Sequence, residues 1–229
     1  MKTIFFGTQP YDRESFDRIN ADYGIRIKYH RSHLNIDNVP LAQGADAVCI
    51  FVNDSADAPT VGELARMGVR LIALRCAGFN NVDLKAAAEH GITVVRVPAY
   101  SPYAVAEHAV ALMLSLNRKV HRAYWRTRDG NFALHGLLGF DMHGKTAGIV
   151  GTGKIARVLI RILRGFGMEV LGYDPCPDEA FARESGMTYV PLAELYRCSD
   201  IISLHCPLTD RTRYMIGDVA ISHMKPGVI

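Results

Sequence analysis

A short glycine-containing turn lies between an apolar run, residues 146–150, and a stretch with helical periodicity, residues 155–163. A strand, a Gly-x-Gly-x-x-small turn and a helix in this order are typical of a dinucleotide-binding Rossmann unit. Gly151 permits the tight turn, Gly153 lets the backbone approach a pyrophosphate, and Ala156 lets the helix pack close to the sheet. The pyrophosphate is expected at the helix N-terminus, where free N–H groups favour an anion.

Asp174 lies 21 residues after Gly153 and directly follows the apolar run 170–173. An acidic residue in this place accepts hydrogen bonds from the adenosine ribose hydroxyls. A 2′-phosphate would meet a like charge there, and no arginine follows within the next few residues. The sequence therefore predicts NAD rather than NADP. The alternative is that the two glycines form an ordinary strand-to-helix turn and that Asp174 is a loop acid.

Apolar runs alternate with helix-like segments along the whole chain. Strands are expected at 3–6, 25–29, 47–52, 71–74, 93–97, 146–150, 169–173 and 200–204, and the main helices at 11–23, 60–67, 83–90, 103–117, 154–165, 192–196 and 218–223. This alternation predicts an α/β fold with two doubly wound parallel-sheet domains, the first flavodoxin-like and the second a Rossmann domain. The expected boundaries are 1–98 and 99–229.

The segment 103–117 is apolar around most of its circumference, which predicts a helix buried between layers at the junction of the two domains. The stretch that follows it, through Arg128, is amphipathic and basic, and Gly130 ends it. A solvated helix face explains these basic residues better than a nucleic-acid footprint does. The apolar residues 227–229 predict the opening of another buried strand, so the second domain is expected to be incomplete and the chain to be a fragment.

Composition narrows the class of protein. Of 229 residues, 49% are hydrophobic and 21% charged, with a net charge of +3, which indicates a globular chain and excludes a disordered one. The apolar start at Met1 is too short for a signal peptide or a membrane span. Five cysteines without Cys-x-x-Cys spacing predict reduced thiols, a cytoplasmic protein and no metal site.

Five segments together resemble the D-2-hydroxyacid dehydrogenase family, most closely its fermentative D-lactate dehydrogenase branch. They are residues 75–83, 97–100, 105–109, the Gly151 turn and residues 205–209. The resemblance extends from residue 1 to residue 229. It implies an N-terminal substrate domain, a central NAD-binding domain, and hydride transfer between NADH and pyruvate-like 2-oxoacids.

The resemblance also implies the site residues. Substrate contacts are assigned to Ala77 and Gly78, whose backbone N–H groups would bind a carboxylate, and to Tyr100, which would lie over the substrate. Cofactor contacts are assigned to Val105, Gly151, Gly153, Lys154, Ile155, Asp174, His205, Cys206, Pro207 and Thr212. For Tyr100 the alternative is an amphipathic residue packed at a domain junction, and for His205 it is a structural histidine.

The catalytic residues are expected outside this chain. In the family a histidine donates the proton, a glutamate orients that histidine and an arginine polarises the carbonyl, and all three would follow the position of Ile229. No catalytic residue is therefore assigned here, and the chain alone is expected to have little or no activity. Glu107 and His108 do not replace them, because adjacent helical residues point about 100° apart.

Three alternative functions remain open. A reductase of glyoxylate, hydroxypyruvate or a bulkier 2-oxoacid would share the fold, a dinucleotide-sensing protein similar to corepressors would bind NAD without turnover, and a structural remnant would bind nothing. The expected partners are a small 2-oxoacid or 2-hydroxyacid and further copies of the chain as a homo-oligomer. No nucleic acid or membrane is expected.

Overall fold

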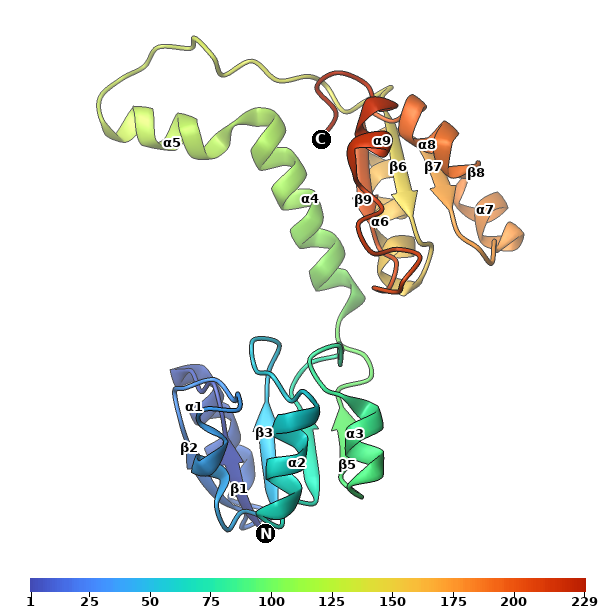
Figure 1. The fold of residues 1–229 in the computed structure, drawn as a ribbon. Helices are drawn as coiled ribbons and strands as arrows, with labels where there is room; N and C mark the ends of the chain where they lie inside the picture. The colour runs from blue at the N-terminus through green and yellow to red at the C-terminus, as the bar shows by residue number, and fades with distance from the viewer. The chain divides into compact units, whose positions relative to one another are not determined.

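The computed structural model describes residues 1–229, and they form two compact units, Met1–Tyr100 and Ser101–Ile229 (Figure 1). Each unit has its own parallel sheet, as the sequence predicts. None of the helices combines the length and the hydropathy that crossing a membrane requires.

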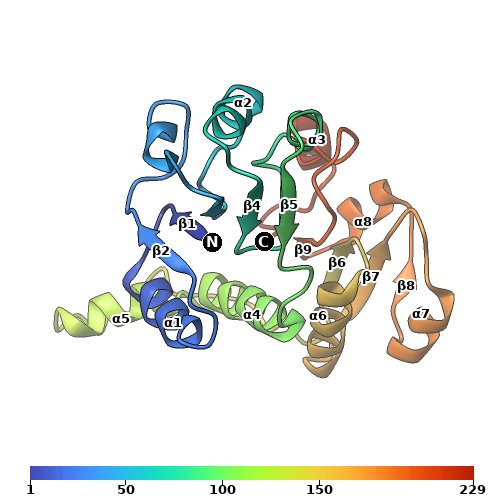
Figure 2. The same cartoon turned by 90° about the horizontal axis from the view of Figure 1, so that it is seen from below.

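Unit 1 is built on a parallel sheet of five strands in the order β2-β1-β3-β4-β5, which is the flavodoxin-like order. The strands are β1 (Lys2–Phe5), β2 (Arg26–Tyr29), β3 (Ala47–Ile50), β4 (Leu71–Leu74) and β5 (Thr93–Arg96). The helices are α1 (Pro10–Asn20), α2 (Ala58–Arg66) and α3 (Leu84–Glu89), with a short 3-10 helix η1 (Val39–Ala42). Helix α1 lies on one side of the sheet and helices α2 and α3 on the other (Figure 2).

Local sequence explains the ends of these helices. The Asp83 carboxylate accepts the N–H of Ala86 at 2.9 Å and caps α3, and Asp57 caps α2 by accepting the N–H of Thr60. Gly91 follows α3 with a φ of +66°, which ends the helix. The main core of the unit lies between the sheet and α2, α3 and η1.

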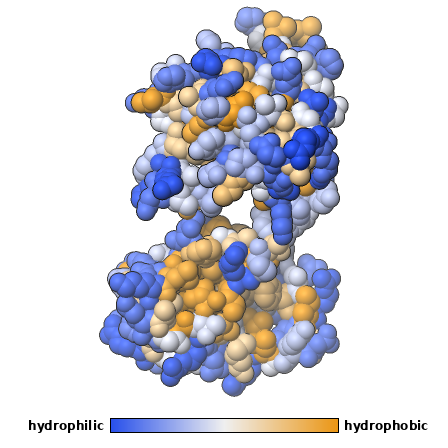
Figure 3. Space-filling model, turned by 90° about the vertical axis from the view of Figure 1, so that its right-hand side faces the viewer, coloured by the Kyte–Doolittle hydropathy of each residue, from blue (hydrophilic) through white to orange (hydrophobic).

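The edge strand β5 is poorly covered. Val95 in this strand is 45% exposed, and Val97, directly after the strand, is 39% exposed. Figure 3, which views the molecule from the β5 side, shows a broad hydrophobic surface on unit 1. An apolar surface of this kind marks a place where another chain segment or another molecule packs.

Unit 2 has four parallel strands in the order β8-β7-β6-β9. The strands are β6 (Thr146–Val150), β7 (Glu169–Tyr173), β8 (Thr188–Tyr189) and β9 (Ile201–Leu204). The helices are α4 (Pro102–Arg118), α5 (Val120–Arg128), α6 (Lys154–Gly165), α7 (Glu179–Ser185), α8 (Leu192–Cys198) and α9 (Asp218–Ser222). Alternate residues of β6 point to opposite faces: Ile149 packs with α4, α6 and α7, and Val150 packs with α8 and α9.

Three sequence predictions about unit 2 need correction. The helix at 103–117 is not buried all round, because Leu112 and Leu116 are 52% and 57% exposed. Helix α7 and the two-residue strand β8 were not predicted, so the strand that leads to His205 is the fourth of its sheet and not the third. Ile229 pairs with β9 through its N–H to Asp200 and its carbonyl to Ile202, but residues 227–229 form no regular strand.

Candidate functional site

The turn between β6 and α6 has two glycines with different tasks. Gly151 has a φ of +88°, and a Cβ there would lie 2.8 Å from the backbone of His205 and Cys206. At Gly153 a Cβ would meet no protein atom within 4 Å, so this side of the turn is open. Ala156 is fully buried where α6 packs on the sheet. This geometry suits a pyrophosphate above Gly153, because no side chain separates it from the first turn of α6.

Asp174, at the end of β7, is held by the same turn. Its Oδ2 accepts the N–H of Thr152 at 2.7 Å and the Thr152 hydroxyl at 3.0 Å, and its Oδ1 accepts the N–H of Cys176 at 2.9 Å. Burial raises the pKa of the Asp174 carboxyl, but these hydrogen bonds and the charge of Arg157 outweigh burial and leave the pKa below its ordinary value. The side chain is therefore an anion at neutral pH.

Sequence reasoning missed three residues around Asp174. Thr152 lies inside the glycine turn at a variable position of the motif, Arg157 is on α6, and Tyr189 is on β8. Arg157 bonds to Thr152 and to Asp178, and the Tyr189 hydroxyl bonds to the same two residues. The only local sequence signal in this region is Asp178 followed by Glu179, a pair that is typical of a helix N-cap and first turn.

The segment after β9 closes the other side of the turn. The N–H of His205 donates to the carbonyl of Val150 at 2.7 Å, and its Nε2 lies 2.9 Å from the Ser203 hydroxyl. Burial lowers the pKa of His205, so the ring is neutral. Cys206 is half-buried beside the Gly151 backbone, and Pro207 is exposed.

The other assigned cofactor residues have simpler surroundings. The Thr212 hydroxyl donates to the carbonyl of Pro207 at 2.6 Å and so folds the loop after β9. Lys154 and Ile155 form the first turn of α6, where Lys154 is exposed. Val105 lies near the start of α4 and is half-buried.

The three assigned substrate residues meet at one cavity of unit 1, with a volume of about 360 Å³. It lies beyond the carboxyl ends of β3, β4 and β5 and is lined by Phe51, Val52, Arg75, Cys76, Ala77, Gly78, Val97 and Tyr100. The backbone N–H groups of Ala77 and Gly78 donate to no protein acceptor. Such unpaired donors at a small-residue turn suit an anionic group of a ligand.

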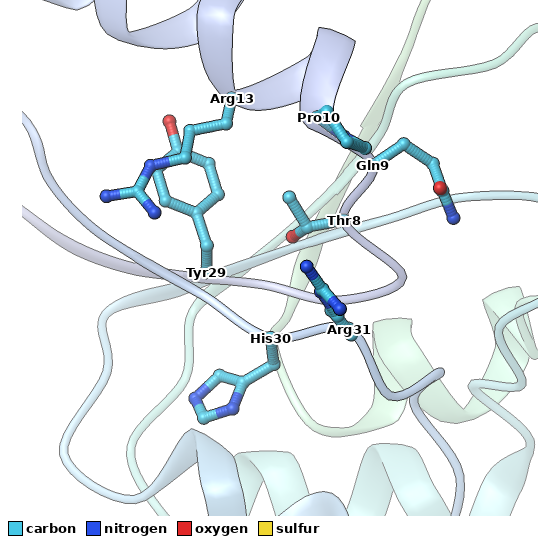
Figure 4. A pocket seen from close by; sticks show the side chains of 7 residues that line it. All are labelled: Thr8, Gln9, Pro10, Arg13, Tyr29, His30 and Arg31. Atoms are coloured by element: carbon cyan, nitrogen blue, oxygen red, sulfur yellow. The ribbon is translucent and has the colours of Figure 1, made fainter.

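A second cavity of unit 1, of about 300 Å³, lies beyond β1 and β2 (Figure 4). None of the assigned residues lines it. Its two arginines, Arg13 and Arg31, are exposed, and Arg13 pairs with Asp17 at 3.4 Å and lies over the ring of Tyr29. The predicted substrate residues therefore line the cavity at Ala77 and Gly78 and not this second cavity.

Comparison with known proteins identifies the family of this chain. The family model for the NAD-binding domain of D-isomer specific 2-hydroxyacid dehydrogenases matches residues 110–229. The whole chain is 52% identical to the D-lactate dehydrogenase of Escherichia coli K12 and covers 69% of that protein. The chain belongs to the D-isomer specific 2-hydroxyacid dehydrogenase family.

Other members of this family are also similar. The chain is 52% identical to 2-hydroxyacid dehydrogenase homolog 1 of Schizosaccharomyces pombe and covers 69% of it. The solved apo structure of the E. coli enzyme matches the whole chain and 72% of its own, with a TM-score of 0.91. The Aquifex aeolicus D-lactate dehydrogenase, solved with NAD and lactic acid, is 32% identical, with a TM-score of 0.85, over 99% of this chain and 67% of its own.

Membership of the family confirms several sequence predictions. The α/β fold, the NAD cofactor and the oxidoreductase class are those of an NAD-dependent 2-hydroxyacid dehydrogenase. The roles of individual residues stay predictions.

Proposed function

We propose that this protein is a D-lactate dehydrogenase, which reduces pyruvate and similar short 2-oxoacids with NADH. The observation that carries the substrate class is the pair of unpaired N–H groups at Ala77 and Gly78, which open onto a cavity of about 360 Å³. A 2-oxoacid offers such donors a carboxylate, and the apolar wall at Val52 and Val97 accommodates a short aliphatic group.

The two units then have separate tasks. In unit 2, Gly153 and the first turn of α6 bind the pyrophosphate, and Asp174 accepts a hydrogen bond from the adenosine ribose. When bound, NADH supplies the hydride. In unit 1, Ala77 and Gly78 bind the substrate carboxylate and Tyr100 covers the substrate. Among residues 1–229 we assign no proton donor, because neither Glu107 nor His108 faces the other on α4.

The protein is further proposed to be a cytoplasmic homo-oligomer. The surface of helix α5 supports an interface with a second copy of the chain. None of its residues is buried, and Tyr124 and Trp125 are each 58% exposed. Large aromatic side chains with this exposure are common in interfaces between subunits. All five cysteines are free thiols, which supports a reducing compartment.

Turnover of NADH with pyruvate tests the proposal. The natural protein, isolated from its source and identified by intact mass, is compared with a polypeptide of residues 1–229. We expect saturable NADH binding by both and pyruvate reduction by the natural protein, with little or no turnover by residues 1–229.

The same assay separates the alternatives. A higher kcat/KM for glyoxylate, hydroxypyruvate or a bulkier 2-oxoacid than for pyruvate would mean that pyruvate is not the preferred substrate. NADH binding by the natural protein without turnover of any 2-oxoacid would indicate a dinucleotide sensor. Absence of saturable NADH binding would contradict the proposed cofactor site itself.

A further inference from the structure

A chain of three hydrogen bonds ends on the Asp174 carboxylate. The N–H of Asp178 donates to the Tyr189 oxygen at 3.1 Å, the Tyr189 hydroxyl lies 2.8 Å from Oγ1 of Thr152, and the Thr152 hydroxyl donates to Asp174 Oδ2. A hydroxyl has only one proton. Because Thr152 gives its proton to Asp174, Tyr189 must be the donor to Thr152. All three bonds therefore point toward the carboxylate and polarise one another.

Arg157 closes this chain into a ring. Its Nε donates to the carbonyl of Thr152 at 3.1 Å and its Nη2 to Asp178 at 2.7 Å. The guanidinium lies 4.7 Å above the ring of Phe181, which fixes its plane. The two-pronged Arg157 guanidinium thus connects Thr152, in the Gly151 turn, to Asp178, where the hydrogen-bond chain starts.

The ring leaves Thr152 little freedom. The residue is 3% exposed, and both its N–H and its hydroxyl are directed at the same oxygen of Asp174. A carboxylate has about four acceptor positions, and Thr152 and Cys176 occupy three of them. The free position that remains for a ribose hydroxyl is therefore on Oδ1, and its direction follows from the orientation that Thr152 and Cys176 give the carboxylate.

We propose that Tyr189 and Arg157 are positioning residues that set the preference for NADH over NADPH by fixing the orientation of the Asp174 carboxylate. The inference rests on the proposed role of Asp174 as the ribose acceptor. It is independent of which 2-oxoacid the enzyme reduces. Neither residue contacts the ribose in this account, since both act through Thr152.

Tyr189→Phe tests the ring without changing any charge. We expect the Kd for NADH to rise about fivefold, the effect of one ordinary hydrogen bond, and the Kd for NADPH to stay the same or fall. The matched control is Tyr196→Phe, which removes a buried hydroxyl that has no hydrogen-bond partner. It should leave the ratio of the two Kd values unchanged. A purely structural role of Tyr189 would instead weaken both cofactors by the same factor.

Arg157→Lys tests the paired hydrogen bonds of the guanidinium to Thr152 and Asp178, because it keeps the positive charge but not the geometry. A lysine cannot bond to Thr152 and Asp178 with the geometry of a guanidinium, so the Kd ratio should move toward NADPH, as for Tyr189→Phe. Arg161→Lys is the control, because Arg161 lies one turn later on α6, also contacts Phe181 and pairs with Glu184 at 2.8 Å, but does not touch Thr152. Equal ratios for the two lysine variants would overturn the proposal.

Asp174→Asn separates this inference from the proposed site. If Asp174→Asn changes the Kd ratio and Tyr189→Phe and Arg157→Lys do not, the ring has no role in selectivity. If Asp174→Asn itself leaves the ratio unchanged, the proposed ribose acceptor is wrong. Thermal unfolding of each variant without cofactor shows whether it is folded, and if Tyr189→Phe or Arg157→Lys does not fold, the Kd ratio of the other variant decides.

Discussion

The backbone N–H and the hydroxyl of Thr152 donate to the same oxygen of Asp174, at 2.7 and 3.0 Å. The glycine turn thus fixes the acid that stands 21 residues after Gly153. Donors to a carboxylate stabilise its charged form, which is why the pKa of Asp174 lies below its ordinary value in spite of burial. If Asp174 accepts the ribose as proposed, cofactor choice in this unit depends on a charge held in a fixed direction.

Removal of this charge should invert the cofactor preference. Asp174→Asn keeps the shape of the side chain, but the loss of a charge-assisted hydrogen bond, about 1.5–3 kcal/mol, should raise the Kd for NADH at least tenfold. The Kd for NADPH should fall, because the 2′-phosphate no longer meets a like charge. Fluorescence titration with each cofactor measures both values. Glu184→Gln, on the exposed side of α7, is the control, and equal weakening of both cofactors would contradict the prediction.

The two glycines of the turn should separate stability from binding. Gly151→Ala forces a Cβ to 2.8 Å from the backbone of His205 at a φ of +88°, and we expect it to destabilise the protein by about 2 kcal/mol or more. Gly153→Ala meets no protein atom, so its stability should change by less than about 0.5 kcal/mol while NADH binding is lost. Urea unfolding and NADH titration of both variants give the two quantities. Tight NADH binding by Gly153→Ala would place the pyrophosphate elsewhere.

The sequence predicts the cofactor turn well because its signals are local. The ends of β6, α6 and β7 agree with the predicted ranges residue for residue, since two glycines and a strong apolar periodicity mark them. Strand β8 has only two residues and α7 has seven, which is too short for periodicity to show. Tyr189 was missed for the same reason, as its role depends on a hydrogen bond to a residue 37 positions earlier.

Helix α4 illustrates a different limit. Its apolar residues predict contacts around the whole helix, but a pattern cannot say which contacts the chain itself provides. Within residues 1–229 only the face with Ala106, Val110 and Met113 is buried, and Leu112 and Leu116 remain exposed. The assigned substrate residues also depended on the resemblance, because no spacing rule connects Gly78 with Tyr100.

His205 should make stability depend on pH below its ordinary pKa of 6.5. Burial lowers its pKa in the folded protein, so below pH 6.5 the unfolded chain binds a proton that the folded protein does not. Stability must then decrease as the pH falls from 6.5 toward the folded pKa. Compared with His205→Gln, the wild type should lose unfolding free energy over this range, as measured by urea unfolding at several pH values. Parallel curves for the two proteins would show that His205 titrates alike in both states.

Arg75 connects the wall of the substrate cavity to the start of α1. Its guanidinium donates to the carbonyls of Phe6 and Gly7 at 3.0 and 2.8 Å, and its Nε lies 3.4 Å from Asp12. Both charged side chains are only 10% exposed. Arg75→Met therefore leaves a buried carboxylate and two carbonyls without their partner, and we expect a loss of about 3–5 kcal/mol.

A double-mutant cycle isolates the ion pair within this loss. Asp12→Asn removes the uncompensated charge, so the double variant Arg75→Met/Asp12→Asn should be less destabilised than the sum of the two single variants. Arg13→Met is the matched surface control, because Arg13 and Asp17 are 68% and 52% exposed and their pair should contribute about 0–1 kcal/mol. Urea unfolding of the five proteins, wild type included, supplies the cycle and its control. Additive losses for Arg75 and Asp12 would mean that the arginine stabilises unit 1 through the two carbonyls and its packing on Phe51, and not through its charge.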